Sequence, residues 1–401
     1  MDVFYYLSKE DAIIAGMSKE QSIQEFAEAH PEIKTPYYIA DESLLVKNLE
    51  IIKSIGEKSG AKFVLALKCF SMWSVFPLMS KYLHGTTSSA IYEARLGKEY
   101  FGGETQAYSV VFTEEEVKQA REFADKIIFN SVSQLERFYD IAKGIPIGLR
   151  ANPGISYSHF DLSDPARKSC RLGVRDVDSI RAVADKITGL MFHIHCENSD
   201  FSAFTRILEQ VGKDYGDILH KMEWVSLGGG VAYTAPNYPV DEFAARMKKF
   251  SEDFGVQVYF EPGDAAVTMA GYLVTQVCDI VENEGTSAII NAAVETHMLD
   301  NLVYKEDGTL PPFIKPVTPG EHRYIITGNT CLAGDVWGTY DFPSALEVGD
   351  YVVFDNALRY SMVKMNWFNG VQMPSIVVKR LDGTVDVVRE FTYDDFRTTL
   401  S

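Results

Sequence analysis

The chain repeats one pattern, a short apolar run rich in β-branched residues followed by a segment with helical spacing. The pattern occurs eight times over roughly two hundred residues, which is typical of a parallel (β/α)8 barrel of the TIM type. An open, doubly wound α/β sheet is the alternative. The expected strands are Phe63–Lys68, Leu83–Thr87, Ala107–Phe112, Lys126–Asn130, Pro146–Ala151, Gly189–His195, Trp224–Gly228 and Gln257–Glu261.

Helix signals lie between these runs. Thr113 precedes three glutamates, which suits an N-cap residue with acidic side chains in the first turn. Ser133 with Glu136 three residues later predicts a capping box. Apolar side chains recur on one face of the segment Asp241–Phe254, which predicts an amphipathic helix.

After about residue 264 the pattern changes to strands joined by turns, and little looks helical, so we expect a second, all-β domain. We predict an N-terminal segment over residues 1–35 that packs on either domain, a barrel over 36–264 and a β-sandwich or β-barrel domain over 265–401. The expected strands of the last domain are Ala266–Val281, Ala288–Val294, Arg323–Thr327, Tyr351–Phe354, Ser375–Arg380 and Val385–Arg389.

Composition limits the classes of function. The net charge of -18 disfavours nucleic acid and anionic lipid and favours cationic partners. The five cysteines are odd in number and lack C-x-x-C spacing, which indicates a reducing compartment rather than disulfides or a zinc ribbon. The N-terminal residues do not read as a signal peptide, and no apolar stretch is long enough to span a bilayer. We therefore expect a cytoplasmic protein that binds neither nucleic acid nor membranes.

Reactive residue types fall at the ends of the predicted barrel strands, where barrel enzymes carry their active sites. Lys68 ends the first strand after five apolar residues. Partial burial lowers the pKa of a lysine, and the neutral amine then reacts with an aldehyde to form a Schiff base. A lysine that simply reaches out to solvent is the alternative for Lys68 taken alone. The residues at the other strand ends favour the catalytic interpretation.

Two further strand ends fit a phosphorylated aromatic cofactor. Gly228, Gly229 and Gly230 follow the seventh strand, and consecutive glycines let backbone amides approach a phosphate. Glu261 ends the eighth strand before Pro262-Gly263, where a carboxylate can pair with a protonated ring nitrogen. An ordinary turn and a salt bridge at the barrel rim are the alternatives.

His193 and His195 share one face of the sixth strand. One ring could stack on an aromatic cofactor, whereas H-x-H on a barrel strand is also a ligand pattern of metal-dependent hydrolases. The other histidines do not fall at strand ends in a way that completes a metal site, so we expect no metal. We interpret His195 as a core residue.

The chain resembles, from about Thr35 to its C-terminus, the pyridoxal-phosphate decarboxylases of the alanine-racemase fold. This group includes the ornithine, arginine and diaminopimelate decarboxylases, and the likeness is strongest to the carboxynorspermidine (carboxyspermidine) decarboxylases. The segments that carry the resemblance are Ala66–Phe70, Ser88–Gly97, Arg171–Gly173, His195–Glu197, Glu261–Gly263 and Gly328–Asp335.

The resemblance implies pyridoxal 5'-phosphate as cofactor and a homodimer with shared active sites. It implies that Cys331, supplied by the neighbouring subunit, gives a proton to the substrate carbon that has lost carbon dioxide. The implied cofactor contacts are Lys68 as the covalent lysine, His193 on the ring face, Gly228, Gly229, Gly230 and Tyr360 at the phosphate, and Glu261 at the ring nitrogen.

Three positions differ from related sequences and bear on the choice of substrate that the resemblance implies. Asp264 follows Glu-Pro-Gly where that type has arginine, and Asp335 comes four residues after Cys331 rather than directly after it. Leu299 stands where the carboxynorspermidine group usually has proline, before Asp300. The resemblance implies decarboxylation of carboxynorspermidine or carboxyspermidine to norspermidine or spermidine, in polyamine biosynthesis. We expect Glu261, Asp300 and Asp335 to contact this small cationic substrate.

Four alternatives stay open at this point. One is a decarboxylase of the same fold that acts on diaminopimelate or a basic amino acid. An amino-acid racemase is disfavoured by Glu261, because racemases usually place arginine against the ring nitrogen. A non-catalytic barrel that binds pyridoxal phosphate would lack the second domain, and a metal-dependent barrel hydrolase would need further ligands.

Overall fold

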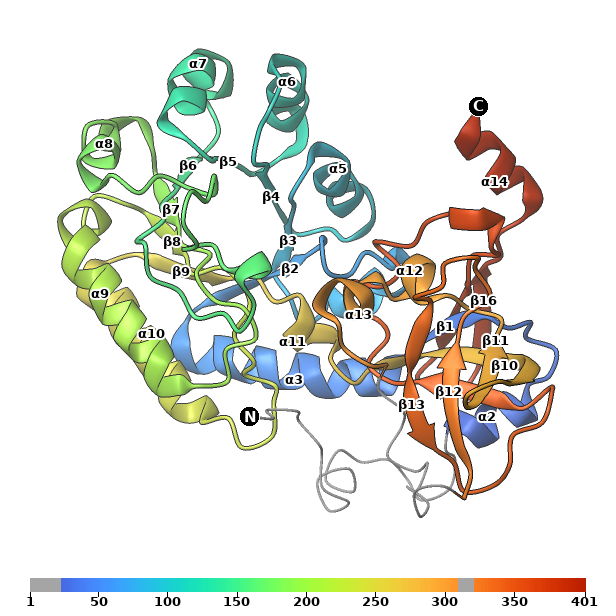
Figure 1. Cartoon of the computed structure of the whole chain (residues 1–401). Coiled ribbons are helices and arrows are strands. Elements are labelled where there is room, and N and C mark those ends of the chain that lie inside the picture. Colours follow the sequence, from blue (N-terminus) through green and yellow to red (C-terminus); the bar gives the residue numbers. More distant parts are fainter. Residues whose placement is uncertain (1–22, 309–320) are drawn as a thin grey trace. The chain divides into compact units, whose positions relative to one another are not determined.

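The computed structural model describes residues 23–308 and 321–401, and the chain divides into two compact units (Figure 1). The barrel unit spans Leu45–Thr268. The sheet unit combines residues 23–44 with the described residues from Met269 onward. Residues 1–22 of the predicted N-terminal segment lie outside the described residues.

The barrel unit contains eight parallel strands that close on themselves, because the last strand pairs with the first. This confirms the predicted (β/α)8 barrel, and the open doubly wound sheet is wrong. The strands are β2 Lys62–Ala66, β3 Gly85–Thr87, β4 Glu104–Tyr108, β5 Lys126–Phe129, β6 Ile147–Arg150, β7 Gly189–Met191, β8 Trp224–Ser226 and β9 Gln257–Phe260.

Helices connect the strands and cover the outside of the barrel (Figure 1). The longer helices α7, α9 and α10 bury apolar side chains along one face, as α10 does with Phe243, Met247 and Phe250. The helices of this part of the chain are α3 Glu42–Ser59, α4 Phe76–Met79, α5 Ile91–Tyr100, α6 Glu114–Phe123, α7 Val132–Ala142, α8 Val177–Arg181, α9 Phe201–Leu219, α10 Val240–Phe254 and α11 Asp264–Val267.

One predicted cap is confirmed and one is wrong. Thr113 caps α6, and its hydroxyl accepts a hydrogen bond from the Glu116 amide at 3.3 Å. Helix α7 begins earlier than expected, with Ser131 as its cap, accepting from the Gln134 amide at 3.3 Å. The capping box predicted at Ser133 does not form, because Ser133 already lies inside the first turn of α7.

The barrel interior is filled by side chains from six of its strands, among them Tyr108, Met191 and Trp224. Trp224 occupies space that glycines on the neighbouring strands leave open, since a Cβ atom at Gly189 would lie 2.1 Å from the Trp224 ring. At the starting ends of the strands, Lys126 forms a shielded ion pair with Glu104 and donates to the Tyr259 hydroxyl at 3.1 Å. The packing closes this end, so the functional end of the barrel is the other one.

The sheet unit is built on one mixed sheet. Its strand order is β13-β12-β11-β10-β1-β15-β16, and β14 also pairs with β10. Strand β1 runs antiparallel to β10 and parallel to β15. The strands are β1 Tyr37–Asp41, β10 Gly271–Glu282, β11 Thr286–Ile290, β12 Arg323–Thr327, β13 Val336–Asp341, β14 Tyr351–Phe354, β15 Ser375–Lys379 and β16 Val385–Arg389.

The structure moves the predicted boundary at residue 36. Residues 36–44 fall in the sheet unit rather than the barrel, because β1 pairs with two strands of that sheet. Helix α2, Ile23–Ala29, packs in the same hydrophobic cluster as β1. The described residues after Met269 also include three helices, although little helix was expected there: α12 Val294–His297, α13 Leu299–Tyr304 and α14 Tyr393–Leu400.

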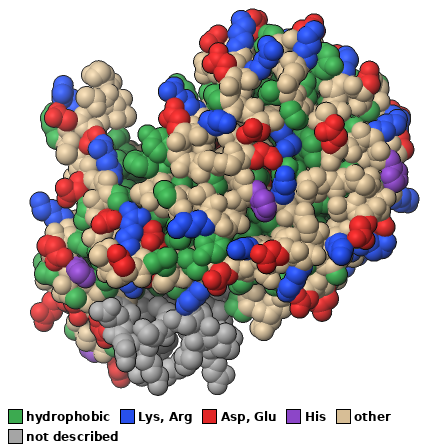
Figure 2. Space-filling view, turned by 180° about the vertical axis from the view of Figure 1, so that it is seen from behind, with side chains coloured by type: hydrophobic (Ala, Val, Ile, Leu, Met, Phe, Trp, Pro, Cys, Tyr) green, Lys and Arg blue, Asp and Glu red, His purple; other side chains and the backbone are tan. Residues whose placement is uncertain are grey.

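Acidic and basic side chains are interspersed on the face of the molecule shown in Figure 2. Within residues 23–308 and 321–401, no helix combines the length and apolar character needed to cross a bilayer. The five cysteines are all free.

Candidate active site

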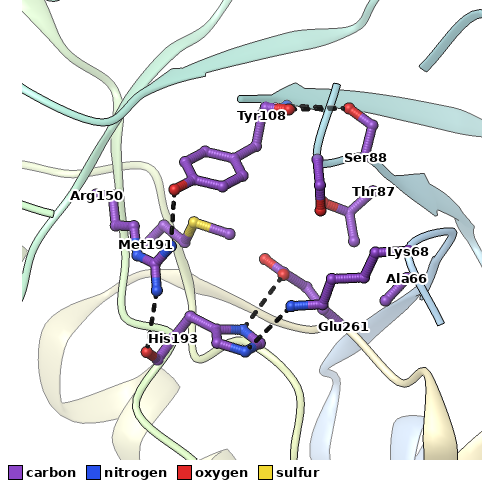
Figure 3. Close-up of a pocket in the computed structure, with 10 residues that line it drawn as sticks. Ala66, Lys68, Thr87, Ser88, Tyr108, Arg150, Met191, His193 and Glu261 are labelled. Carbon is purple, nitrogen blue, oxygen red and sulfur yellow. Dashed lines mark hydrogen bonds and ion pairs between the residues drawn. The ribbon is translucent and has the colours of Figure 1, made fainter. Parts of the chain in front are cut away.

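Lys68 lies in the turn that follows β2, and its side chain is half-buried. Its Nζ atom is 3.4 Å from Nε2 of His193. Burial lowers the pKa of Lys68, and the nearby Glu261 carboxylate opposes that change. Lys68, His193 and Glu261 therefore meet at the mouth of the barrel, as the strand ends predicted, and Figure 3 shows their side chains converging.

Glu261 directly follows β9 and is 3% exposed. Its Oε1 atom accepts a hydrogen bond from the Ser226 hydroxyl at 2.5 Å. Its Oε2 atom lies 3.9 Å from Nδ1 of His193. Burial raises the pKa of Glu261, and the Ser226 hydrogen bond opposes the change. A buried carboxylate in this position favours a cationic partner, which would hold it ionised.

His193 is held by the loop after β8. The Gly229 amide donates to Nδ1 of His193 at 3.2 Å, so the neutral ring carries its proton on Nε2, facing Lys68. Burial lowers the pKa of His193 well below its ordinary value, and the charges of Lys68 and Arg150 lower it further. The ring is therefore neutral at physiological pH.

The three glycines after β8 are needed for close packing. A Cβ atom at Gly228 would lie 2.7 Å from Nδ1 of His193, and one at Gly230 would lie 2.1 Å from the His195 carbonyl. The backbone of Gly228 and of Gly230 also has positive φ. The Gly228 amide donates to Ser226 at 3.2 Å, so this amide, like that of Gly229, is engaged within the protein. A phosphate contact at these glycines stays a prediction.

His195 is a core residue, as expected. It is 3% exposed, its ring packs against Phe204, and its Nδ1 atom lies 3.1 Å from the Asn198 side-chain amide. Burial lowers its pKa to about 3. In the described part of the chain, no group of three or more His, Cys, Asp or Glu residues is arranged to hold a metal ion.

Arg150 and Tyr108 line the same pocket and were not predicted from the sequence. The Arg150 guanidinium donates to the Tyr108 hydroxyl at 2.7 Å and to the His193 carbonyl at 3.4 Å (Figure 3). The Tyr108 hydroxyl in turn donates to Asn130 at 3.0 Å. Arg150 is the last residue of β6, so the rule that located Lys68 at a strand end could have found it as well.

Cys331 and Asp335 belong to one loop of the sheet unit. Cys331 is exposed, and its backbone amide donates to Oδ1 of Asn369 at 2.6 Å. Asp335 is 3% exposed and accepts hydrogen bonds from the amides of Val294 and Thr330 and from the Thr330 hydroxyl. Both of its carboxylate oxygens hold the loop in place, and the expected substrate contact of Asp335 stays a prediction.

Asp300 and Tyr360 lie near one another in the sheet unit. Asp300, in the first turn of α13, forms an ion pair with Lys364. The Lys364 ammonium group also lies 5.0 Å from the centre of the Tyr360 ring. Lys364 thus links the predicted substrate carboxylate to the predicted phosphate ligand, and sequence reasoning did not find it.

The comparisons with known proteins agree with this fold and this site. Residues 37–357 match the family described as "Pyridoxal-dependent decarboxylase, C-terminal sheet domain". A protein of Herminiimonas arsenicoxydans named carboxynorspermidine/carboxyspermidine decarboxylase is 48% identical over 92% of this chain and 100% of its own length. The crystal structure of carboxynorspermidine decarboxylase from Campylobacter jejuni, complexed with norspermidine, has a TM-score of 0.84 and 36% identity over 92% of this chain and 100% of that one. Diaminopimelate decarboxylase from Helicobacter pylori, at 18% identity and a TM-score of 0.82 over 94% of this chain and 99% of that one, shares the fold.

The chain has a closed barrel with a lysine, a histidine and a carboxylate at its mouth, and a second unit built on a mixed sheet. It belongs to the pyridoxal-dependent decarboxylases. Within that family it groups with the carboxynorspermidine/carboxyspermidine decarboxylases.

The residues present fit the cofactor of this family. A half-buried lysine with a lowered pKa suits an aldehyde, and the neutral His193 ring offers a face for an aromatic ring. The buried carboxylate of Glu261 suits a protonated ring nitrogen, because a cation beside it would offset the cost of burying its charge.

Proposed function

We propose that this enzyme removes the carboxylate of carboxynorspermidine, carboxyspermidine or both, and releases carbon dioxide and norspermidine or spermidine. The observation that carries the chemistry is the convergence of Lys68, His193 and Glu261 at the barrel mouth. The substrate class is supported by the relatives that bear the corresponding names.

When bound, pyridoxal phosphate supplies an aldehyde for primary amines and a ring that withdraws electrons from the bond to the carboxylate. Lys68 would hold it covalently, His193 would lie against the ring, and Glu261 would pair with the ring nitrogen. Gly228, Gly229, Gly230 and Tyr360 are the proposed phosphate contacts.

The chain's own groups then move and hold protons. Burial favours the unprotonated form of Lys68, and in that form its amine can accept a proton from the incoming substrate amine. The Nε2 proton of His193 faces Lys68 and orients its amine. The Cys331 thiol is the proposed donor of the proton that replaces carbon dioxide on the substrate carbon.

We propose a head-to-tail homodimer in which the partner subunit's Cys331 completes each site. Cys331 belongs to the sheet unit and is exposed within its own chain. An exposed thiol that serves as a proton donor must be brought to a substrate, and a second copy of the chain supplies a barrel mouth for it. The free cysteines are consistent with a cytoplasmic enzyme.

The distal amines of a triamine are cationic and are favoured by carboxylates. Asp300 stays a candidate for this contact, although it would have to exchange Lys364 for a substrate amine. Both are charge pairs of the same kind, so the exchange conserves the number of ion pairs. The net charge of -18 would attract a polycation over a longer distance.

Carbon dioxide release from the purified enzyme tests the proposal. Pyridoxal phosphate should be supplied together with carboxynorspermidine, carboxyspermidine, diaminopimelate, ornithine or arginine in separate reactions. We expect turnover of at least one carboxylated triamine to exceed that of each amino acid by about tenfold or more in kcat/KM. Preferential turnover of diaminopimelate or a basic amino acid would replace the proposed substrate with the sister activity of the same fold.

A further inference from the structure

The C-terminal helix α14, Tyr393–Leu400, is short and lies outside the sheet. It follows the edge strand β16, and Figure 1 shows it as the last, red element of the chain. Asp395 fixes its start by accepting from the Thr392 amide at 2.7 Å and pairing with Arg389. None of the α14 residues is fully buried. The helix therefore adds little to the hydrophobic core, so core packing does not explain its position.

The inner face of α14 packs on the segment that follows Lys364. The Phe396 ring lies 5.7 Å from the Trp367 ring, and its tip lies 3.5 Å from where a Cβ atom of Gly370 would be. The Phe391 ring also packs against Trp367, with the ring centres 6.2 Å apart. The Phe391 carbonyl also accepts from the Gln372 side chain at 2.6 Å. The end of the chain thus clamps the turn around residues 367–372.

The clamped turn contains the residue that holds the proposed proton donor. Asn369 has φ of 55°, a left-handed conformation that points its side chain at the Cys331 loop. Its Oδ1 atom accepts from the Cys331 amide at 2.6 Å. On its inner side the same loop is anchored by Asp335. Two contacts therefore fix the Cys331 loop, one with Asn369 and one with Asp335. Helix α14 acts only on the contact with Asn369.

We propose that α14 is a positioning element for Cys331, acting through Phe396, the Trp367–Gly370 turn and Asn369. The idea rests on the proposed role of the Cys331 thiol as a proton donor. A proton transfer requires donor and acceptor atoms within hydrogen-bond reach, so a small displacement of the loop costs rate without changing the residues that touch the substrate. Asn369 and Phe396 are thus positioning residues for the thiol.

Substitutions at Asn369 separate the hydrogen bond from the backbone shape. Asn369→Gly keeps the left-handed conformation and removes the acceptor, whereas Asn369→Asp keeps both. We expect Asn369→Gly to lower kcat about tenfold with KM changed less than about twofold, and Asn369→Asp to keep kcat within about threefold of wild type. Unchanged kcat in Asn369→Gly would overturn the proposal.

Substitutions on α14 test the remote part of the path. Phe396→Ala should lower kcat about as much as Asn369→Gly, and Phe396→Leu should restore most of it, because leucine still fills the space against Gly370. Leu400→Ala is the matched control, because Leu400 is 65% exposed on the same helix. The kcat of the double variant Phe396→Ala/Asn369→Gly should lie within about twofold of the kcat of the slower single variant, because both substitutions act on one contact. Additive losses would contradict a shared path.

A direct readout of the loop keeps this test independent of the decarboxylase assay. In the holoenzyme, iodoacetamide alkylation of Cys331, followed by peptide mass spectrometry, should accelerate about threefold or more in Asn369→Gly and Phe396→Ala. Alkylation of the exposed Cys278 serves as the internal control and should not change. Equal Cys331 rates in all variants would overturn the positioning role even if wild-type turnover is normal. A wild-type enzyme that releases no carbon dioxide would instead refute the proposed function.

Discussion

The two units hold their functional side chains in different ways. In the barrel unit, Lys68, His193 and Glu261 follow the ends of β2, β7 and β9, and the closed ring of strands brings them together. In the sheet unit, Cys331 and Asp300 lie on a loop and a short helix, and a few side-chain contacts, among them those to Asn369 and Lys364, fix them. The first arrangement follows from the fold itself, whereas the second depends on a few specific side chains.

This difference predicts where the enzyme tolerates change. Barrel positions are set by many backbone hydrogen bonds, so a substitution there removes a chemical group but leaves its neighbours in place. Loop positions are set by one or two side-chain contacts, so distant substitutions can displace an intact functional group. Four predictions test the contrast, from the largest expected effect to the smallest.

Lys68→Ala should abolish the visible absorbance of the bound cofactor and lower kcat by at least about 1,000-fold, because it removes the amine proposed to bind the aldehyde. The fold should persist, which circular dichroism and thermal unfolding can check. Lys62→Ala is the matched control on the starting end of the same strand, where the lysine lies over the Tyr259 ring. A coloured, active Lys68→Ala enzyme would refute the barrel-mouth site.

Glu261→Gln should lower kcat about 100-fold or more, because glutamine keeps the shape and the Ser226 hydrogen bond but loses the charge. Steady-state kinetics and the absorbance spectrum of the holoenzyme measure the effect. Ser226→Ala, which keeps the charge, should cost less than about tenfold. Equal losses in the two variants would mean that position rather than charge matters.

Cys331→Ala should lower kcat about 100-fold while the holoenzyme spectrum stays that of wild type, since the thiol lies in the other unit from the lysine. Cys278→Ala, at another exposed cysteine, should keep full activity. Mixing Cys331→Ala with Lys68→Ala should restore up to about a quarter of wild-type activity if a dimer shares its sites. Failure of the mixture to recover activity, with subunit exchange verified, would argue for sites completed within one chain.

Asp355→Asn should alter the pH dependence of stability rather than catalysis. Asp355 is 2% exposed in the sheet unit, and burial raises its pKa to about 7 from 3.8. The folded chain then binds a proton that the unfolded chain releases, so stability from this group falls as pH rises from about 4 to about 7. The melting temperature should therefore fall less steeply across this pH range in Asp355→Asn than in wild type. Parallel profiles would show that Asp355 is ionised in the folded state.

The sequence was most informative about the barrel. All eight predicted strands overlap observed strands, because each is a buried apolar run between helix signals. Strand β13 was missed because Gly338, with φ of 144°, interrupts its pattern. The residues of β1 were not predicted as a strand and were included in the barrel domain, since local pattern does not reveal partners more than two hundred residues away.

How far the candidate site could be predicted also differs between the two units. Strand ends located Lys68, His193 and Glu261 without any knowledge of side-chain contacts. For Asp335, the sequence did not predict the burial of the side chain or the backbone amides that donate to it. The ion pair of Lys364 with Asp300 spans two elements of the sheet unit, and no local spacing rule connects them.

Strand β1 has a consequence for how the gene can be divided. Because β1 lies between β10 and β15, a fragment that starts after the barrel lacks the centre of its sheet and would expose two bare strand edges. During synthesis on the ribosome, the first strand must wait for neighbours encoded beyond the entire barrel. Expression of the C-terminal part alone is therefore expected to give aggregates, and adding back a peptide that contains residues 37–41 is the natural remedy.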